Sequence, residues 1–175
     1  MRRSLIVAVA ALLAVAVTSS VALARVNVKS APTATFSGGT VTLTGGNFSG
    51  LGNVPAIANF QVTAGVATYT CTNPQGHASP GQNPVAAQAG SISQADLGNA
   101  DHNGRGTISS LSAEIDAPVT PTADEAGCGG SGSDKWTVTL DGLTATAAHL
   151  EITQDGVVVF CRNYTVDGPA TGTAC

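Results

Sequence analysis

The chain is poor in charged and aromatic side chains, and each shortage disfavours a class of function. Charged residues make up 10% of the 175 residues and aromatic residues 4%, with one tryptophan and two tyrosines. The chain has seven Lys and Arg residues and eleven Asp and Glu residues. We therefore expect no basic patch that could bind nucleic acid or an anionic membrane. The few aromatics also disfavour a carbohydrate-binding module, which stacks sugars on exposed Trp and Tyr.

Signatures of catalysis and metal binding are also missing. No cysteine pair has the CxxC spacing of a zinc ribbon or a redox motif, and no serine lies in a G-x-S-x-G elbow. The histidines are His77, His102 and His149, and we expect His149 to face solvent beside Glu151. No acid is singled out by its spacing as a glycosidase carboxylate. The sequence therefore predicts a protein that is not an enzyme and needs no cofactor.

The one long apolar run lies at the N-terminus. Arg2 and Arg3 precede an unbroken apolar stretch at 5–17, and Ala22-Leu23-Ala24 matches the small-x-small cleavage pattern of a signal peptide. The run is short for a membrane span, although a retained anchor helix is the alternative. We expect a signal peptide at 1–24 and a secreted, extracellular protein of residues 25–175.

The four cysteines are an even number in a chain expected to be exported, which favours disulfides over thiol chemistry. They are Cys71, Cys128, Cys161 and Cys175. Four cysteines allow three pairings, and the sequence does not strictly choose among them. We favour Cys71–Cys128 and Cys161–Cys175, because the second pair closes a short Gly/Pro loop at the C-terminus. The first would close a long loop, for which the chain-entropy treatment gives about 4 kcal/mol.

Short alternations of apolar and polar residues recur between turn signals, the pattern of an all-β protein. We expect one domain of about eight strands, an Ig-like β-sandwich stapled by the disulfides. Gly38-Gly39 and Asp155-Gly156 mark hairpins. A polar turn at 98–104 joins two further candidate strands, and the segment 116–134 is too rich in Pro, Gly and Asp to be a strand.

Two strands carry specific predictions about the core. The apolar parity of the strand 59–71 shifts at Gly65, which marks a bulge. Its expected inward residues are Phe60, Val62, Ala64, Ala67, Tyr69 and Cys71. In the strand 135–140, Trp136 shares a face with Val138 and Leu140 and is the expected centre of the core.

The stretch CTNPQGHASPGQNP at 71–84 looks most like a site. A nucleophilic cysteine paired with His77 would need a thiolate, and disulfide bonding is the stronger claim on Cys71. Asn73-Pro74 and Pro80-Gly81 are turn dipeptides, so we expect a rigid, stapled loop without regular structure of its own. The polar residues with no expected core role form the predicted partner-binding loop: Asn73, Gln75, His77, Gln82 and Asn83.

A weak metal candidate lies at 99–104. The pattern Asn99-x-Asp101-x-Asn103-Gly104 resembles the first half of a calcium-binding loop. It lacks a carboxylate at the first position, and Ser110 stands where a bidentate glutamate is expected. We therefore favour a hairpin turn that uses Asn and Gly for positive φ angles, and we expect no metal.

Two stretches, NFSGLGN at 47–53 and TYTCTNPQGHASPGQNP at 68–84, resemble a functionally uncharacterised group of small exported proteins of high-GC Gram-positive bacteria. In that group a strand ends in a Cys-x-Asn-Pro-x-Gly turn, here Cys71 to Gly76. The resemblance implies an exported bacterial protein and supports the all-β fold. It contributes no catalytic residue.

Two classes of function remain. The favoured one is a secreted, non-catalytic binding or surface module whose partner is an extracellular protein or a polysaccharide. The alternative is a secreted enzyme inhibitor that presents the 71–84 loop, and a hydrolase is less favoured.

Overall fold

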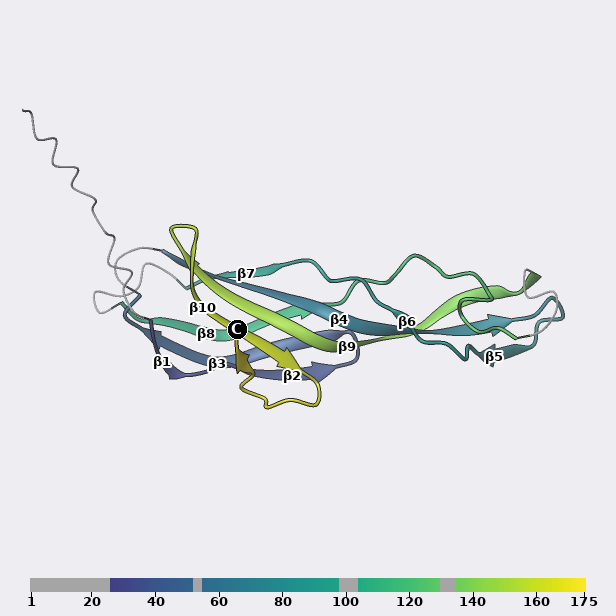
Figure 1. Cartoon of the computed structure of the whole chain (residues 1–175), viewed down its shortest axis with the longest axis horizontal. Helices are drawn as coiled ribbons and strands as arrows, with labels where there is room; N and C mark the ends of the chain where they lie inside the picture. The colour runs from purple at the N-terminus through teal and green to yellow at the C-terminus, as the bar shows by residue number, and fades with distance from the viewer. Residues whose placement is uncertain (1–25, 52–54, 98–103, 130–134) are drawn as a thin grey trace, which may run out of the picture.

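The computed structural model describes residues 26–51, 55–97, 104–129 and 135–175 (Figure 1). Within these ranges the chain is all-β and forms two antiparallel sheets. The expected signal peptide at 1–24 lies outside the described residues, as do His102 and the calcium candidates Asn99, Asp101 and Asn103. No helix in the described ranges is long and apolar enough to cross a bilayer.

The smaller sheet has four strands around a central β3. Its strands are β1 (Asn27–Ser30), β2 (Thr33–Ser37), β3 (Thr40–Ser49) and β8 (Gly106–Glu114). β8 runs along one side of β3, whereas β2 and then β1 pair with it on the other. The predicted hairpin at Gly38-Gly39 is confirmed, because Ser37 pairs with Thr40 and Gly38 has a φ of 55°.

The larger sheet has seven strands built on two long ones. They are β4 (Ala56–Thr72), β5 (Ala78–Pro80), β6 (Val85–Ala86), β7 (Ser93–Asp96), β9 (Thr137–Gln154), β10 (Val157–Thr165) and β11 (Thr173–Ala174). The order is β11-β10-β9-β4, and β7, β6 and β5 pair in turn along the outer edge of β4. The predicted all-β sandwich is confirmed, and the strands beyond the expected eight are short pieces such as β5, β6 and β11.

The hairpin predicted at Asp155-Gly156 joins β9 to β10. Asp155 has a φ of 48° and Gly156 a φ of 75°, and Gln154 pairs with Val157. Positive φ at both central residues is what a two-residue type I′ turn requires, so this prediction is confirmed. The hairpin predicted at 98–104 is wrong, because β7 pairs with β4 and β8 pairs with β3. The two flanking strands thus belong to different sheets, and residues 98–103 between them lie outside the described ranges.

The main core lies between the two sheets, in a region that we call the body. Large side chains from both sheets fill it and are fully buried, among them Val41, Leu43, Phe60, Val62, Leu150, Ile152 and Tyr164. The rings of Phe48 and Phe160 meet edge to face at 5.1 Å, and those of Phe60 and Tyr164 at 6.5 Å. Such pairs contribute about 0.5–1.5 kcal/mol beyond the area they bury.

The molecule is elongated because β4 and β9 continue together beyond the body (Figure 1). We call this extension the distal arm: residues 66–86, 117–129 and 135–142. It has its own small core, formed by Ala67, Tyr69, Cys71, Ala123, Ala126 and Cys128. One sheet supplies one side of this core, and the strandless segment 117–129 covers the other.

The predicted parity shift in β4 is confirmed and lies where the body gives way to the arm. The ladder with β9 is irregular between Val62 and Gly65, and the buried residues change from Phe60 and Val62 to Ala67, Tyr69 and Cys71. The prediction for Ala64 is wrong. Its side chain is exposed, because the irregularity begins directly after Val62, two residues before Gly65.

Trp136 is not the centre of the core, so that prediction is also wrong. It precedes β9, is only half-buried, and packs against the small core of the arm. Leu140, on the same face, is 41% exposed. The alternation was read correctly, but the second sheet does not extend over this part of β9, so the tryptophan remains at the surface.

Candidate binding site on the distal arm

Both predicted disulfides are present and leave no free cysteine. Cys71 and Cys128 have Cα atoms 5.6 Å apart, lie 57 residues apart in sequence, and are buried in the arm. Cys161–Cys175 joins β10 to the C-terminal residue. Because Cys71 is bonded to Cys128, its sulfur is not a free thiol and is not available as a nucleophile paired with His77.

The turn after Cys71 is built on the side chain of Asn73. Its Oδ1 accepts hydrogen bonds from the backbone N–H groups of Gln75 at 3.0 Å and His77 at 2.9 Å. Asn73 N–H donates to the carbonyl of His77 at 3.0 Å, and Gly76 adopts a φ of 85°. Asn side chains commonly hydrogen-bond the backbone of their own turn in this way. The side-chain oxygen of Asn73 therefore stabilises the loop.

The 71–84 loop contains regular structure, contrary to the prediction. β5 returns along β4, so that Thr72 pairs with Ala78 and Thr70 with Pro80. Gly81 N–H then donates to the carbonyl of Tyr69 at 2.7 Å. The segment is therefore a hairpin whose tip is the 73–77 turn.

Asn83 attaches this hairpin to the segment that carries Cys128. Its backbone N–H donates to the carbonyl of Ala126 at 3.2 Å, and its Nδ2 donates to the carbonyl of Glu125 at 3.3 Å. Gln82 Nε2 bonds the carbonyl of Pro80 at 3.3 Å but remains exposed. Of the five predicted contact residues, Asn73 and Asn83 hold the arm together, whereas Gln75, His77 and Gln82 face solvent.

The segment opposite is ordered by a single capped turn. Glu125 Oε2 accepts from the backbone N–H of Thr122 at 2.8 Å and from its Oγ1 at 2.9 Å, and Glu125 N–H donates to Thr122 Oγ1 at 3.3 Å. The two bonds from Thr122 to the carboxylate stabilise its charged form and lower the pKa of Glu125. Gly127, with a φ of 70°, ends the turn just before Cys128. The sequence signal was Thr122-x-x-Glu125, a capping box that the reading of 116–134 as a plain loop missed.

A hollow of about 460 Å³ lies beside this turn. It is lined by Thr120, Pro121, Thr122, Ala123, Asp124, Trp136 and Val138. Val119, next along the chain, is 82% exposed. We call this feature the Trp136 hollow. Sequence reasoning missed it because it had assigned Trp136 to the core.

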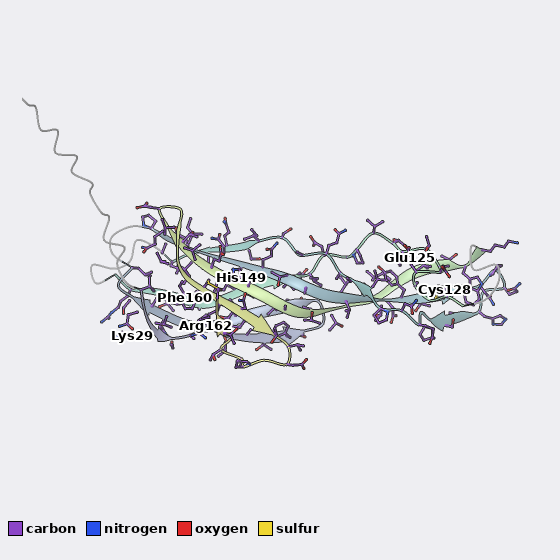
Figure 2. All side chains as sticks on the ribbon, viewed as in Figure 1. Lys29, Glu125, Cys128, His149, Phe160 and Arg162 are labelled. Carbon is purple, nitrogen blue, oxygen red and sulfur yellow. A yellow bond between two sulfur atoms is a disulfide. The ribbon has the colours of Figure 1, made fainter. Side chains whose placement is uncertain are left out.

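His149 lies on the body, apart from the arm. Its Nδ1 is 2.7 Å from Asn163 Oδ1 and its Nε2 is 3.0 Å from Glu151 Oε1. The expected neighbour Glu151 is thus confirmed, although the His149 side chain is only 29% exposed. Figure 2 places His149 on the body and Glu125 and Cys128 at the far end of the molecule. His77 and His149 therefore do not share a site.

The outer face of the smaller sheet forms a second distinctive surface. Three strands in register present rows of short hydroxyl side chains with one carboxylate at a corner: Ser37, Thr40 and Glu114; Thr35, Thr42 and Ser112; Thr33, Thr44 and Ser110. Neighbours bond one another, as Thr42 Oγ1 does with Ser112 Oγ at 2.9 Å. We call this face the hydroxyl grid. It is polar and nearly uncharged, and part of its hydrogen-bonding capacity is satisfied internally.

Comparison of the chain with known protein families, curated proteins and solved structures finds no significant match. The resemblance to exported proteins with a Cys-x-Asn-Pro-x-Gly turn stays a prediction. Across the described ranges, no group of three or more His, Cys, Asp or Glu side chains is placed to hold a metal ion. The geometry of the arm is therefore the basis for assigning a function.

Proposed function

We propose that the protein is a secreted, non-catalytic binding module that engages an extracellular partner through its distal arm. The observation that carries this proposal is the position of the Trp136 hollow and the 73–77 turn on one projecting end. Export is supported by the two disulfides, which persist in oxidising compartments.

The arm is suited to binding because it is already ordered. The Cys71–Cys128 disulfide, the bonds of Asn73 and Asn83, and the capped turn at Thr122 fix the segments that would contact a partner. A surface that is rigid before contact loses little conformational entropy on binding. The exposed side chains of Gln75 and His77 and the half-buried Trp136 supply contacts on this frame.

A non-catalytic role is favoured by the distribution of reactive groups. The four cysteines are bonded in pairs, and His77 and His149 belong to different regions. A nucleophile and its base need to lie within hydrogen-bond reach of each other. Neither histidine has a cysteine thiol to activate.

The test is capture of partners from culture medium and cell-wall fractions of the producing organism, with the mature protein as bait. We expect the partner bound by the native protein to be lost from the bait Gln75→Ala/His77→Ala/Trp136→Ala. A matched control, Thr35→Ala on the hydroxyl grid, should retain it. Equal capture by the arm variant and the native protein would show that the binding surface lies elsewhere.

An enzyme inhibitor is a second candidate, and the 73–77 turn is the observation that favours it. A short turn locked by two bonds to Asn73 Oδ1 and followed by a bonded β5 has the rigidity that tight inhibitors use. The native protein would then form stable complexes with secreted proteases in a panel assay. Gln75→Ala/His77→Ala should abolish the complexes, and Trp136→Ala should leave them unchanged.

A further inference from the structure

The Trp136 hollow combines three kinds of wall. Trp136 supplies an aromatic ring, and Pro121, Ala123 and Val138 supply apolar surface. Among the described residues that line the hollow, Asp124 supplies the only charged side chain. Thr122 also lines it, but its hydroxyl donates to Glu125. Among the lining residues with side-chain hydroxyl or carboxyl groups, only Thr120 and Asp124 thus lack such an internal bond.

The charge of the surroundings has one dominant sign. Residues 64–90 of the arm and its base carry no Asp, Glu, Lys or Arg. In the described parts of 116–142 the charged residues are Asp116, Asp124, Glu125, Lys135 and Asp141. These described residues thus comprise four acidic side chains and one basic side chain. The basic one, Lys135, is exposed and is not among the residues that line the hollow.

We infer that the Trp136 hollow binds a basic side chain, lysine or arginine, of an extracellular polypeptide. This inference rests on the proposed function and names the partner chemistry at the arm. The cationic head would lie over the ring of Trp136, the aromatic side chain that attracts cations most strongly. It would reach the carboxylate of Asp124, to which a charge-assisted hydrogen bond is stronger than a neutral one.

The apolar walls fit the rest of such a side chain. Lys and Arg side chains lay their methylene groups along apolar surface while the charged group stays in contact with water or polar groups. Pro121, Ala123 and Val138 provide that surface in a hollow of about 460 Å³, within the range of sites for small ligands. The acidic arm would also attract a basic partner before contact.

The frame around the hollow keeps the carboxylate in place. Asp124 lies inside the turn capped by Thr122 and Glu125, and its own carbonyl accepts from Gly127 N–H at 3.0 Å. Cys128 follows at once and is bonded to Cys71. Asp124 therefore presents its side chain from a segment that needs no rearrangement on binding.

Trp136 is the single tryptophan of the chain, so its fluorescence reports directly on the hollow. The mature protein is titrated with Nα-acetyl-lysine N-methylamide and with the arginine equivalent. We expect a saturable change in emission for both. The matched neutral probe, in which the lysine amine is acetylated, should give no saturable change.

Two variants locate the effect. Asp124→Asn keeps the shape and the backbone bonds. It should weaken binding by up to about fivefold, or about 1 kcal/mol, the upper end for an ion pair with an exposed carboxylate. Asp141→Asn, a carboxylate on the same arm outside the hollow, should bind as the native protein does. Both variants are first checked for native melting temperature. A Trp136→Leu variant, followed by ligand-observed NMR, should also lose the basic probes.

Each other result overturns the inference. An equal response to the acetylated probe would mean that the hollow recognises apolar stems only. A response to cellobiose or chitobiose but not to the basic probes would assign the hollow to a saccharide. No response to any probe, together with arm-dependent capture of a partner, would leave the proposed function standing and remove this inference from it.

Discussion

The body and the distal arm use the same two strands but are stabilised in different ways. In the body, β4 and β9 face a second sheet, and large side chains such as Phe60 and Tyr164 meet between the layers. In the described part of the arm no second sheet covers β4 and β9, and the core consists of Tyr69 and small residues around Cys71–Cys128. The arm therefore depends on a covalent link where the body depends on burial.

The difference follows from how much apolar surface each region can cover. Burial contributes roughly 25 cal/mol per Å², and small folds that bury little surface usually need a disulfide or a metal. The arm also packs backbone against backbone. A Cβ added at Gly81 would lie 2.7 Å from the carbonyl oxygen of Ala126. Close approach and cross-linking thus replace large side chains.

The largest expected effect comes from removing a ring from the body. Phe60→Ala should lower the free energy of unfolding by about 3–5 kcal/mol, because the fully buried ring leaves a cavity. Chemical denaturation measures the loss. Ile57→Ala on the same strand is the matched control, since Ile57 is 40% exposed. A similar loss from both changes would contradict the assignment of Phe60 to the core.

The next effect comes from the arm disulfide. Cys71→Ala/Cys128→Ala should cost about 4 kcal/mol in the chain-entropy treatment, against about 3 kcal/mol for Cys161→Ala/Cys175→Ala, because the closed loops span 57 and 14 residues. Hydrogen exchange locates the loss. The N–H groups of Gly81 and Cys128 should lose protection first, while those of Leu150 stay protected. Simultaneous loss of protection in both regions would show that the arm and the body unfold as one unit.

A smaller, pH-dependent effect on stability comes from a buried tyrosine of the body. Burial raises the pKa of Tyr164 to about 12, and the nearby Arg162 opposes this weakly. The unfolded phenol ionises near its ordinary value of about 10. The stabilising effect of this group is therefore complete below pH ~10 and is lost as pH rises through about 12. At neutral pH, Tyr164→Phe should lose about 1 kcal/mol, because its hydroxyl bonds the carbonyl of Pro32 at 3.3 Å.

Alkaline denaturation of the native protein and of Tyr164→Phe tests this. The variant should be the less stable of the two at pH 7, and its disadvantage should shrink or reverse between pH ~10 and ~12. Tyr69 in the arm, whose pKa burial also raises, is present in both proteins and cancels in the comparison. A constant difference across this range would refute the raised pKa of Tyr164.

The smallest effect concerns the capped turn. Thr122→Ala removes the N-cap hydroxyl and should cost about 1 kcal/mol, confined to the arm. The depressed pKa of Glu125 adds a pH dependence of the opposite sense. Its contribution is present above the ordinary pKa of 4.5 and is lost as pH falls through the lower folded value. Melting curves from pH 7 to pH 3 measure both, and a Thr122→Ala protein with native acid sensitivity would contradict the role of the Thr122–Glu125 pair.

Much of the fold was predictable because local chemistry decides it. Gly38-Gly39 and Asp155-Gly156 favour tight turns through their φ preferences, and Gly65 marks the parity change in β4. The even cysteine count indicated two disulfides, and the short loop between Cys161 and Cys175 favoured the observed pairing over the two alternatives. These features need no knowledge of distant segments.

The candidate site was less predictable because it depends on tertiary placement. Alternation showed that Trp136 and Val138 share a face, but it did not show that the cover over that face is the 117–129 segment in place of a sheet. Asn73 and Asn83 were predicted to be available to a partner. In the structure their side chains bond backbone groups of the arm, and such bonds leave no pattern of paired side chains in the sequence. The Thr122–Glu125 capping box was readable in the sequence and supplied the one missed local signal.

The length of the β4–β9 ladder has a mechanical consequence. The pairing runs without leaving the two strands from Ala56 and Gln154 in the body to Thr72 and Thr137 near the tip, and 17 residues of β4 extend about 56 Å at 3.3 Å per residue. The ladder bonds lie perpendicular to the strands, so tension along the long axis loads them together in shear and not one after another. A pull applied between the 73–77 turn and the C-terminus would meet this shear-loaded ladder, and single-molecule force spectroscopy should record one high rupture force in place of a series of low ones.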